Sequence, residues 1–527
     1  MAATAPRICV LGGGVSGLTT AFLLQRGLPH ARISVIERST RCGGSILSTR
    51  SAQGSVVEQG FHSSILVDRH GREALGLFGL LGLGDDVVSA NVESSARKHL
   101  LHKGKVQLVP RLAHMLRYGP AFLTEPLWSR GRAEDESVHA FVSRRISASV
   151  ADSLADPICR GQLAGDARHL SVRTCFPRLW YNERRFRSVF LGSALAVLPA
   201  HNLRSWLSLD LMDPLLQRVV TGGRNYSIRA GLGALPARLE ERLRSPPPGT
   251  RPAEVVMGEA VQALRPRGPD SVAAEAVTGN DEQSGGAAPS AVDVVLSSGR
   301  ALSADLVVCT LPPRDLAQLL HASGLSDDGS DESIGSHLER VEFNPVRVVS
   351  FTFDRDVLRG RFRGAGYFCG SLEESPVLAV TSDSQLFPAQ DGDAPGATRL
   401  TFHLDGRTVG SDDAAQSAAL EALLSHLAIT EAPAEVSVRL WAEAAPQYGV
   451  GHRGVLRSLE AKRRRELPWL QLAGPGYFGV RSVADEVVDA RKLTDALLRR
   501  FAAFPDLVEN EIDEDSLPRY GGGFDIA

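Results

Sequence analysis

Residues 7–37 read RICVLGGGVSGLTTAFLLQRGLPHARISVIE, and this stretch decides the fold. RICVL is a short apolar run of the kind found in buried strands, and RISVIE is a second run rich in β-branched residues. Between them, LTTAFLLQRG has the pattern of a helix and ends at Gly27, a favoured position for a helix C-terminus. Strand, turn, helix and strand in this order predict a parallel sheet with a right-handed crossover.

The glycines between the first strand and the helix fit a dinucleotide-binding turn. Gly12, Gly14 and Gly17 satisfy the GxGxxG pattern. The first glycine permits a tight turn, the second lets a pyrophosphate approach the backbone, and the third lets the helix pack closely on the strand. Glu37 follows Gly17 by 37 − 17 = 20 residues, where a carboxylate accepts hydrogen bonds from ribose hydroxyls. The alternative is a glycine-rich turn without a ligand, and the strand, helix and acid around the motif favour the dinucleotide.

A second glycine turn indicates which dinucleotide is bound. Glu37 is followed by RSTRCGGSI, which brings the pair Gly43 and Gly44 close to the ribose-binding acid. This spacing is typical of FAD-binding chains rather than of NAD dehydrogenases, and the alternative is a plain surface turn. The run VVEQGFHS, Val56–Ser63, resembles the strand that passes under the flavin ring in flavin-dependent amine oxidases. The sequence therefore predicts FAD.

Length and composition exclude several classes of protein. A chain of 527 residues is too long for one compact core and suggests two or three lobes. Lys plus Arg is 58 and Asp plus Glu is 61, and this near balance argues against a nucleic-acid-binding protein. The six cysteines form no CxxC pair, so a disulfide framework is not expected.

The remaining sequence supports a mixed α/β fold with more than one sheet. Strand character returns in the ranges 253–264, 291–296 and 305–311, and alternating strands run between 347 and 441. Residues 70–180 show helical patterning and little strand signal. Glycine or proline interrupts both long uncharged stretches, 8–25 and 188–203, so neither reads as a membrane span, and no targeting presequence is read before Arg7.

Five segments resemble the protoporphyrinogen oxidase family, and most closely its oxygen-dependent, FAD-containing eukaryotic form. The matches run in order along the chain from about residue 7 to residue 500. The combination of the CRG…AG…LSxRxCFP run with PQYxxGH distinguishes this family from other flavin enzymes. The segments are DPICRGQLAGDARHLSVRTCFPRL (156–179), GGRNYSIRAGLGALPARLEERL (222–243), FPAQDG (387–392), APQYGVGH (445–452) and AGPGYFGV (473–480).

The resemblance implies three lobes: a discontinuous Rossmann-like FAD domain, a mixed-sheet substrate domain and a helical membrane-binding domain. It places the FAD domain at residues 1–94, 222–313 and 442–527, the helical domain at 95–221 and the substrate domain at 314–441. The implied reaction converts protoporphyrinogen IX to protoporphyrin IX for heme biosynthesis, with oxygen as acceptor and peroxide released. The cofactor carries this chemistry, and the family supplies no agreed side-chain acid or base, so no catalytic residue is named.

The resemblance also implies a setting and partners. It predicts noncovalent FAD, peripheral attachment to the mitochondrial inner membrane, a homodimer and contact with ferrochelatase, with no nucleic acid. The segment Arg111–Trp128 mixes Leu, Met, Phe and Trp with Arg and Tyr and is broken by prolines, which suits a segment lying on a membrane surface. The alternative is a helical lobe packed on itself.

Site residues follow position by position from the resemblance. Arg97 is expected to pair with a porphyrinogen propionate, with the adjacent Lys98 as the alternative cation and a solvated pair as the plain interpretation. Ala365 stands where the family has an aromatic residue, and His403 replaces an apolar pocket residue. The flavin contacts are expected from Gly12, Gly13, Gly14, Val15, Ser16, Gly17, Glu37, Arg38, Gly43, Gly44, Ser45, Gly60, Phe61, His62, Ser63, Val261 and Val480, and the substrate pocket from Arg97, Gly161, Ala365, Phe368 and His403.

Two other interpretations stay open at the level of sequence. Another flavin enzyme of the amine-oxidase group, such as a polyamine oxidase or a carotenoid desaturase, shares the FAD motifs but not the CRG…CFP run. A non-catalytic protein on the same scaffold, like the Rab GDP-dissociation inhibitors, is the other, because fold alone does not settle function. A metal site is not predicted, because His99 and His102 have no third ligand nearby.

Overall fold

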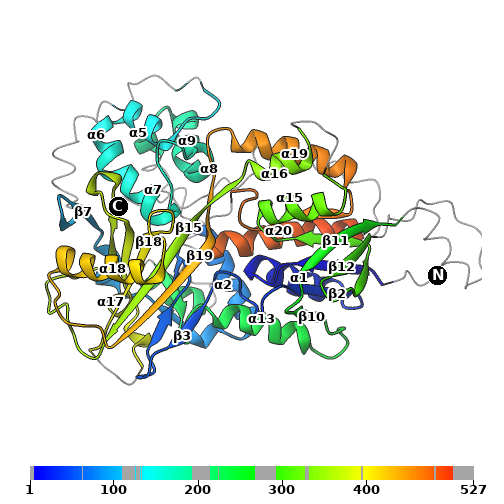
Figure 1. The fold of residues 1–527 in the computed structure, drawn as a ribbon, viewed down its shortest axis with the longest axis horizontal. Coiled ribbons are helices and arrows are strands. Elements are labelled where there is room, and N and C mark those ends of the chain that lie inside the picture. Colours follow the sequence, from blue (N-terminus) through cyan, green and yellow to red (C-terminus); the bar gives the residue numbers. More distant parts are fainter. Residues whose placement is uncertain are drawn as a thin grey trace, which may run out of the picture.

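The computed structural model places its two larger β-sheets side by side, with a group of short helices above one of them (Figure 1). His62, Val480 and, apart from Glu125, the segment Arg111–Trp128 lie outside the residues that the structure describes. The described residues are 5–61, 63–109, 125, 131, 133–192, 214–223, 225–267, 292–326, 332–392, 396–479 and 482–501.

The first sheet is parallel and contains the strand–helix–strand unit predicted from residues 7–37. Its strand order is β10-β2-β1-β14-β20, and all four pairings are parallel. Strands therefore come to this sheet from segments far apart in the chain, and β1 lies at its centre. The elements are β1 (Arg7–Leu11), α1 (Val15–Gly27), β2 (Arg32–Glu37), β10 (Glu254–Met257), β14 (Leu306–Cys309) and β20 (Leu470–Leu472).

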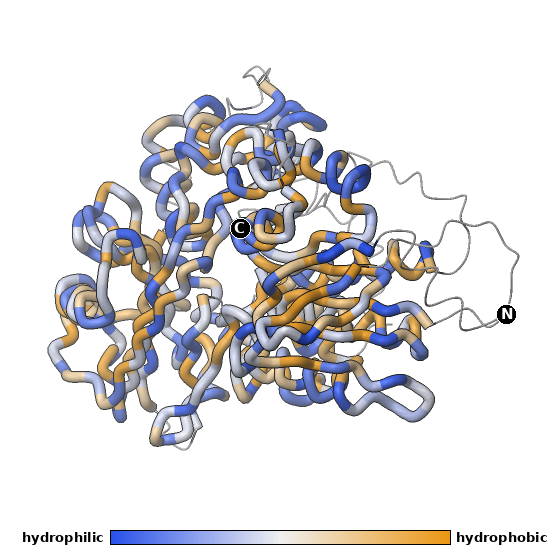
Figure 2. The backbone as a smooth tube through the Cα atoms, turned by 45° about the vertical axis from the view of Figure 1, so that its right-hand side comes forward, coloured by the Kyte–Doolittle hydropathy of each residue, from blue (hydrophilic) through white to orange (hydrophobic). Residues whose placement is uncertain are grey.

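Apolar layers cover both faces of the parallel sheet. Ile8 and Val10 of β1 belong to one buried cluster, and Cys9 and Leu11 belong to another. Such two-sided burial is the reason that the strands of a parallel sheet read as continuous apolar runs, and they are among the most hydrophobic stretches in Figure 2. One layer holds α1, α2 (Arg69–Leu81), α13 (Ala234–Arg244) and α20 (Val483–Phe501), and the other β11 (Val261–Pro266), β12 (Val292–Leu296), β13 (Ala301–Ala304), α15 (Pro313–Ala322), α16 (Ile334–Glu339) and α19 (His452–Glu466).

The second sheet has seven strands in the order β19-β15-β18-β17-β16-β7-β8. Its pairings are antiparallel except for the parallel pair β16–β7. Helix α18 (Asp412–Leu427) packs on one face, in a cluster with Leu400, Phe402 and Leu404 of β18. The strands are β7 (His99–His102), β8 (Lys105–Leu108), β15 (Glu342–Phe353), β16 (Gly366–Cys369), β17 (Val377–Ser382), β18 (Thr398–Asp405) and β19 (Glu435–Gln447).

The expectation of little strand structure in residues 70–180 is wrong for β6 (Val87–Ser89), β7 and β8. These strands are three or four residues long, and their pattern alone does not distinguish them from loops. They form strands because they hydrogen-bond to strands from distant parts of the chain: β7 pairs with β16, and β6 pairs with β9 (Asn225–Ile228). The domain boundaries given above stay a proposal. Further short elements are β3 (Ser48–Arg50), β4 (Val56–Glu58), β5 (Ile65–Leu66), α3 (Val92–Ala96) and α17 (Asp383–Leu386).

Short helices between residues 138 and 221 form the third group. Helices α5 to α9 share a buried cluster that includes Phe141, Cys159, Phe176 and Trp180, whereas α12 packs through Val219 against the core beside the parallel sheet. In the part of the chain that the structure describes, no helix combines the length and the hydropathy that crossing a membrane requires. The helices are α5 (Val138–Arg145), α6 (Ala148–Val150), α7 (Asp156–Leu163), α8 (Val172–Cys175), α9 (Pro177–Phe186) and α12 (Pro214–Thr221).

Candidate functional site

The glycine turn lies at the carboxyl end of β1, where parallel sheets bind their ligands. Two of its glycines are held tightly: a Cβ on Gly17 would lie 2.0 Å from the carbonyl oxygen of Gly12, and a Cβ on Gly12 would lie 2.6 Å from Oγ1 of Thr310. A Cβ on Gly14, by contrast, would meet no protein atom within 4 Å. The turn therefore offers open space beside Gly14 at the N-terminus of α1, which fits a pyrophosphate.

Glu37 joins the two glycine turns that the sequence singles out. Its carboxylate accepts hydrogen bonds from the backbone N–H groups of Gly13 and Ser39, both at 2.8 Å. The N–H of Gly43 in turn donates to the carbonyl of Gly13 at 2.8 Å. Gly43 has φ of 116°, a conformation that favours glycine. The structure thus brings the GxGxxG turn, the acid and the second glycine pair together.

Arg41 fixes the second turn in a way that the sequence does not reveal. Its guanidinium donates to the carbonyls of Cys42, Ile46 and Gly44 at 3.1, 3.0 and 2.7 Å. The same group lies over the indole of Trp441, 5.8 Å from the ring centroid. Burial lowers the pKa of Arg41. Trp441 is 400 residues away in sequence, so no local pattern could identify this contact.

Arg38 and Ser45, the other polar residues predicted near this turn, are less enclosed. Arg38 is largely exposed and pairs with Asp315 of α15 at 3.1 Å. Ser45 is half-buried. Val261 begins β11, which lies near Glu37 because the N–H of Glu259 donates to the Glu37 carbonyl at 3.2 Å.

The C-terminal part of the chain closes the same site from the other side. Ser16, at the start of α1, donates both its N–H and its hydroxyl to the carboxyl group of Glu486, at 3.1 and 2.8 Å. Burial raises the pKa of Glu486 to about 7. The N–H of Gly474 donates to Asp489, whose pKa burial raises to about 6. Both acids come from α20, and the sequence offered no signal for them beyond an acidic first turn.

The strand predicted to pass under the flavin is held against the seven-stranded sheet. Trp441 of β19 donates from Nε1 to the carbonyl of Gln59 at 2.7 Å, and Ser350 of β15 donates to the carbonyl of Glu58 at 3.1 Å. The Glu58 carboxyl accepts hydrogen bonds from Ser48 and from the N–H of Leu232, and burial raises its pKa to about 7. This strand therefore joins the parallel-sheet region to the second sheet.

Phe61 continues that strand and reaches the predicted substrate pocket. Its ring meets the His403 imidazole edge to face, with centroids 5.8 Å apart. Phe61 shares a small apolar cluster with Ala164, Val346 and Leu378. The predicted flavin turn and one predicted pocket residue are thus in contact, and Gly60 forms a bend together with Phe61.

The other predicted pocket residues lie in three separate places around the seven-stranded sheet. Gly161 of α7 faces Phe368 of β16, because a Cβ on Gly161 would lie 2.1 Å from the phenyl ring. Ala365 precedes β16 and packs beside a separate cluster that contains Leu386 and Phe387. Arg97 ends α3 and forms an ion pair with Glu93 at 2.6 Å, at the protein surface.

Other sequence features do not form a site. All six cysteines are free thiols. Within the described ranges, no group of three or more His, Cys, Asp or Glu side chains is arranged to hold a metal ion. His99 packs its ring on Phe362, with centroids 4.7 Å apart, as a core residue does.

Comparisons with known proteins agree with this geometry. The family described as flavin containing amine oxidoreductase matches residues 15–480. The human protein named protoporphyrinogen oxidase is 31% identical over 93% of this chain and 98% of its own length. The protein of Bacillus subtilis named coproporphyrinogen III oxidase is 24% identical over 90% of this chain and 94% of its own.

Solved structures show the same fold. A protein from Exiguobacterium sp. 255-15 is 21% identical, covers 94% of this chain and 99% of its own, and superposes with a TM-score of 0.71. The chain is thus built as a flavin containing amine oxidoreductase, and it belongs, within that class, to the protoporphyrinogen oxidase family.

Proposed function

We propose that the chain oxidises protoporphyrinogen IX to protoporphyrin IX in heme biosynthesis, with FAD as cofactor and oxygen as acceptor, releasing hydrogen peroxide. The observation that carries the proposal is the near full-length similarity to the human protoporphyrinogen oxidase. The site supports it, because the glycine turn has open space beside Gly14, and Phe61, in the predicted flavin turn, contacts the predicted pocket residue His403.

The cofactor is held by the backbone of the glycine turns. The open side of Gly14 takes the pyrophosphate, the Glu37 carboxylate lies where the ribose hydroxyls of a dinucleotide bind, and the turn at Gly60 and Phe61 supports the ring system. When bound, FAD accepts the hydride equivalents removed from the porphyrinogen. The chain's own part is to orient the two molecules and to exclude water.

Attachment of the flavin is noncovalent in this proposal. Cys42 is the thiol nearest the glycine turn, since a Cβ on Gly13 would lie 3.1 Å from its sulfur. Burial raises the pKa of Cys42 to about 12, so the thiolate that a flavin linkage would need is scarce at neutral pH.

Substrate binding is assigned to the pocket of the seven-stranded sheet. Gly161 lets α7 approach Phe368 closely, and these two residues with His403 form the wall opposite the flavin turn. Arg97 is assigned to a propionate at the rim, because its partner Glu93 is exposed and a carboxylate ligand would replace it. Lys98 is the alternative anchor.

The proposed setting is the mitochondrial inner membrane, with peripheral attachment, a homodimer and contact with ferrochelatase. The support is the similarity to eukaryotic relatives and the amphipathic character of Arg111–Trp128. Sedimentation with liposomes tests the attachment: protein that stays wholly in the supernatant without detergent contradicts it.

The decisive experiment is anaerobic mixing of the flavin-loaded protein with protoporphyrinogen IX. Loss of the oxidised flavin absorbance, followed by its return on admission of air with formation of protoporphyrin, is expected. Coproporphyrinogen III and a polyamine are the comparison substrates, and faster reduction by either would reassign the substrate. Protein that binds no flavin would favour a non-catalytic binding protein on the same scaffold.

A further inference from the structure

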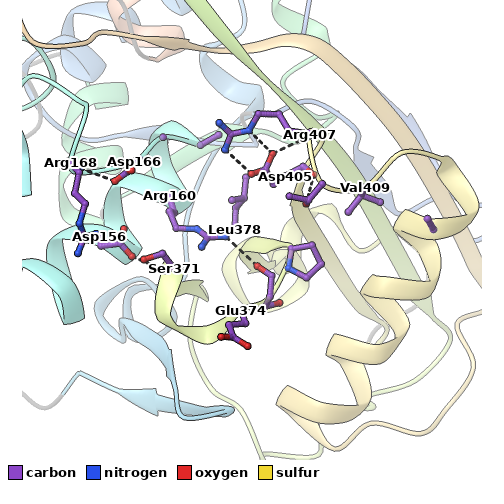
Figure 3. Close-up of a pocket in the computed structure, with 16 residues that line it drawn as sticks. Asp156, Arg160, Asp166, Arg168, Ser371, Glu374, Leu378, Asp405, Arg407 and Val409 are labelled. Carbon is purple, nitrogen blue, oxygen red and sulfur yellow. Dashed lines mark hydrogen bonds and ion pairs between the residues drawn. The ribbon is translucent and has the colours of Figure 1, made fainter.

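A cavity of about 690 Å³ lies between α7 and the end of the seven-stranded sheet, apart from the glycine turns (Figure 3). Asp156 and Arg160 line it from one side of α7, because residues four apart share a helix face, and Ala164 lines it just after the helix ends. Leu378 of β17 and Asp405 of β18 line it from the sheet. Its volume is in the range of about 300–1,000 Å³ that is usual for ligand sites. We call it the α7 cavity.

Most charged groups of the α7 cavity already have partners. Asp405 accepts two hydrogen bonds from the Arg407 guanidinium, at 2.9 and 2.7 Å, and these bonds hold its pKa below its usual range despite partial burial. The buried carboxylate of Asp156 accepts the N–H of Ser371 at 2.7 Å. Arg168 pairs with Asp152 at 2.6 Å.

Arg160 differs from these groups because its hydrogen-bond partner is a backbone carbonyl. Its guanidinium is half-buried and donates to the carbonyl of Ser375 at 3.2 Å. It forms no ion pair with a described carboxylate, although its charge helps to lower the pKa of Asp405. Figure 3 shows its side chain between Asp156 and Leu378. A guanidinium carries several N–H donors in one plane, so a carboxylate could bind the remaining ones through both of its oxygens.

The α7 cavity is separated from the flavin turn by one layer of side chains. Ala164 and Leu378 line the cavity and also belong to the apolar cluster that contains Phe61. Asp405 lies two residues after His403 on β18, and alternate residues of a strand point to the same face. A molecule in the cavity would therefore be near the reaction site but not against the flavin.

We propose that the α7 cavity is a second porphyrin site, which binds protoporphyrin IX through one propionate on Arg160. This inference rests on the proposed function, because that reaction supplies a largely apolar ligand with carboxylates. The apolar wall of Ala164, Leu378 and Pro376 suits the macrocycle, and Arg160 is the cation for its carboxylate. The site binds product rather than reacting substrate, since the wall keeps its occupant from the flavin turn.

The test is a titration of the oxidised, flavin-loaded protein with protoporphyrin IX, followed by porphyrin fluorescence. The wild type is expected to bind a second porphyrin per flavin, and Arg160→Met to weaken this second event by roughly ten- to a hundredfold, as loss of a charge-assisted contact should. Arg168→Met is the matched control: it removes a guanidinium that lines the same cavity but is paired with Asp152, and the titration should stay unchanged.

Two further experiments test the site even if Arg160→Met does not fold. Ala414→Trp fills the cavity from its exposed rim and should abolish the second event. Protoporphyrin dimethyl ester, which lacks free carboxylates, should lose the part of the affinity that depends on Arg160. Binding of a single porphyrin by the wild type, or a second event unaffected by both variants, would overturn the site. Failure of protoporphyrinogen to reduce the flavin would instead overturn the proposed function.

Discussion

The two large sheets differ in the kinds of side chain that they bury. The parallel sheet is apolar on both faces, and its predicted functional groups, at the ends of β1 and β2, are the backbone of the glycine turns and the Glu37 carboxylate. In the seven-stranded sheet, β18 is apolar toward α18 but buries Arg399, Thr401, His403 and Asp405 on its other face. The proposed cofactor site is therefore built mainly from glycines, whereas the proposed substrate side is built from enclosed polar side chains. Substitutions in the two regions should consequently have different effects: loss of the cofactor in the first region, and loss of stability or substrate affinity in the second.

The largest effect is expected at the parallel sheet, from Gly14→Val. The new side chain would enter the space left for the pyrophosphate, and its Cβ would meet no protein atom within 4 Å, so the chain should fold but purify without flavin colour. Absorbance near the flavin maximum and the thermal unfolding curve measure the two outcomes. Gly76→Val in α2, where a Cβ also meets nothing within 4 Å, is the control and should keep its flavin. Full flavin content in Gly14→Val would show that the turn does not bind the cofactor.

The next largest effect is expected in the seven-stranded sheet, from Arg399→Met. Arg399 forms a buried ion pair with Asp391 at 2.7 Å and donates to the carbonyls of Val56 and Phe387. Its removal leaves the Asp391 carboxylate enclosed without its partner, which typically costs about 3–5 kcal/mol. Denaturant unfolding checks this. The comparison is the surface pair of Arg359 with Glu431, in which the arginine is exposed, and Arg359→Met should cost no more than about 1 kcal/mol. Equal effects of the two variants would contradict the special role of the buried polar face.

A pH-dependent effect is expected from Asp383, which begins α17 and accepts a hydrogen bond from Thr401 of the same polar face at 2.6 Å. Burial raises its pKa from 3.8 to about 6. Because the folded pKa is the higher one, the protonated group favours folding below about pH 4, and this contribution is lost as the pH rises through about 6. Asp383→Asn should thus be more stable than the wild type at pH 8, by up to about 3 kcal/mol, and equal to it below pH 4.

Unfolding free energies at pH 4, 6 and 8 test that expectation. Glu241→Gln on the exposed side of α13 is the matched control and should leave the pH profile unchanged. A difference between Asp383→Asn and the wild type that is independent of pH would mean that the carboxyl acts through packing rather than through its charge.

The smallest effect is expected at the rim of the substrate side, from Arg97→Ala. Loss of a charge-assisted propionate contact should lower kcat/KM by roughly ten- to a hundredfold, corresponding to about 1.5–3 kcal/mol. KM should rise more than kcat falls, because the propionate is remote from the reacting carbon. Arg97→Lys should retain more activity than Arg97→Ala. A loss in Lys98→Ala with normal kinetics in Arg97→Ala would transfer the role to Lys98.

Sequence alone predicted the parallel sheet well because its signals are local. The strand, the glycine turn, the helix and Glu37 lie within residues 7–37, and the structure confirms that unit. Contacts between distant segments could not be predicted, such as those of Ser16 with Glu486 or of Arg41 with Trp441. The alternation in TRLTFHLD predicted a strand, but such a pattern usually places its polar side chains in water. These polar side chains are buried because the segment around β4 (Val56–Glu58) covers them, and sequence alone does not show that contact.

The dispersed origin of the parallel sheet also constrains how the protein is synthesised. Strand β1 gains β2 as soon as residue 37 has emerged, but its other neighbour, β14, begins at residue 306. At roughly 5–20 residues per second, those 306 − 37 = 269 residues take on the order of 15–50 seconds to translate. During that interval one edge of β1 has no partner strand, and unpaired edges favour association with other chains. Helper proteins on the ribosome, or early burial of that edge by neighbouring segments, would therefore affect the yield of active protein more than the stability of the finished fold would.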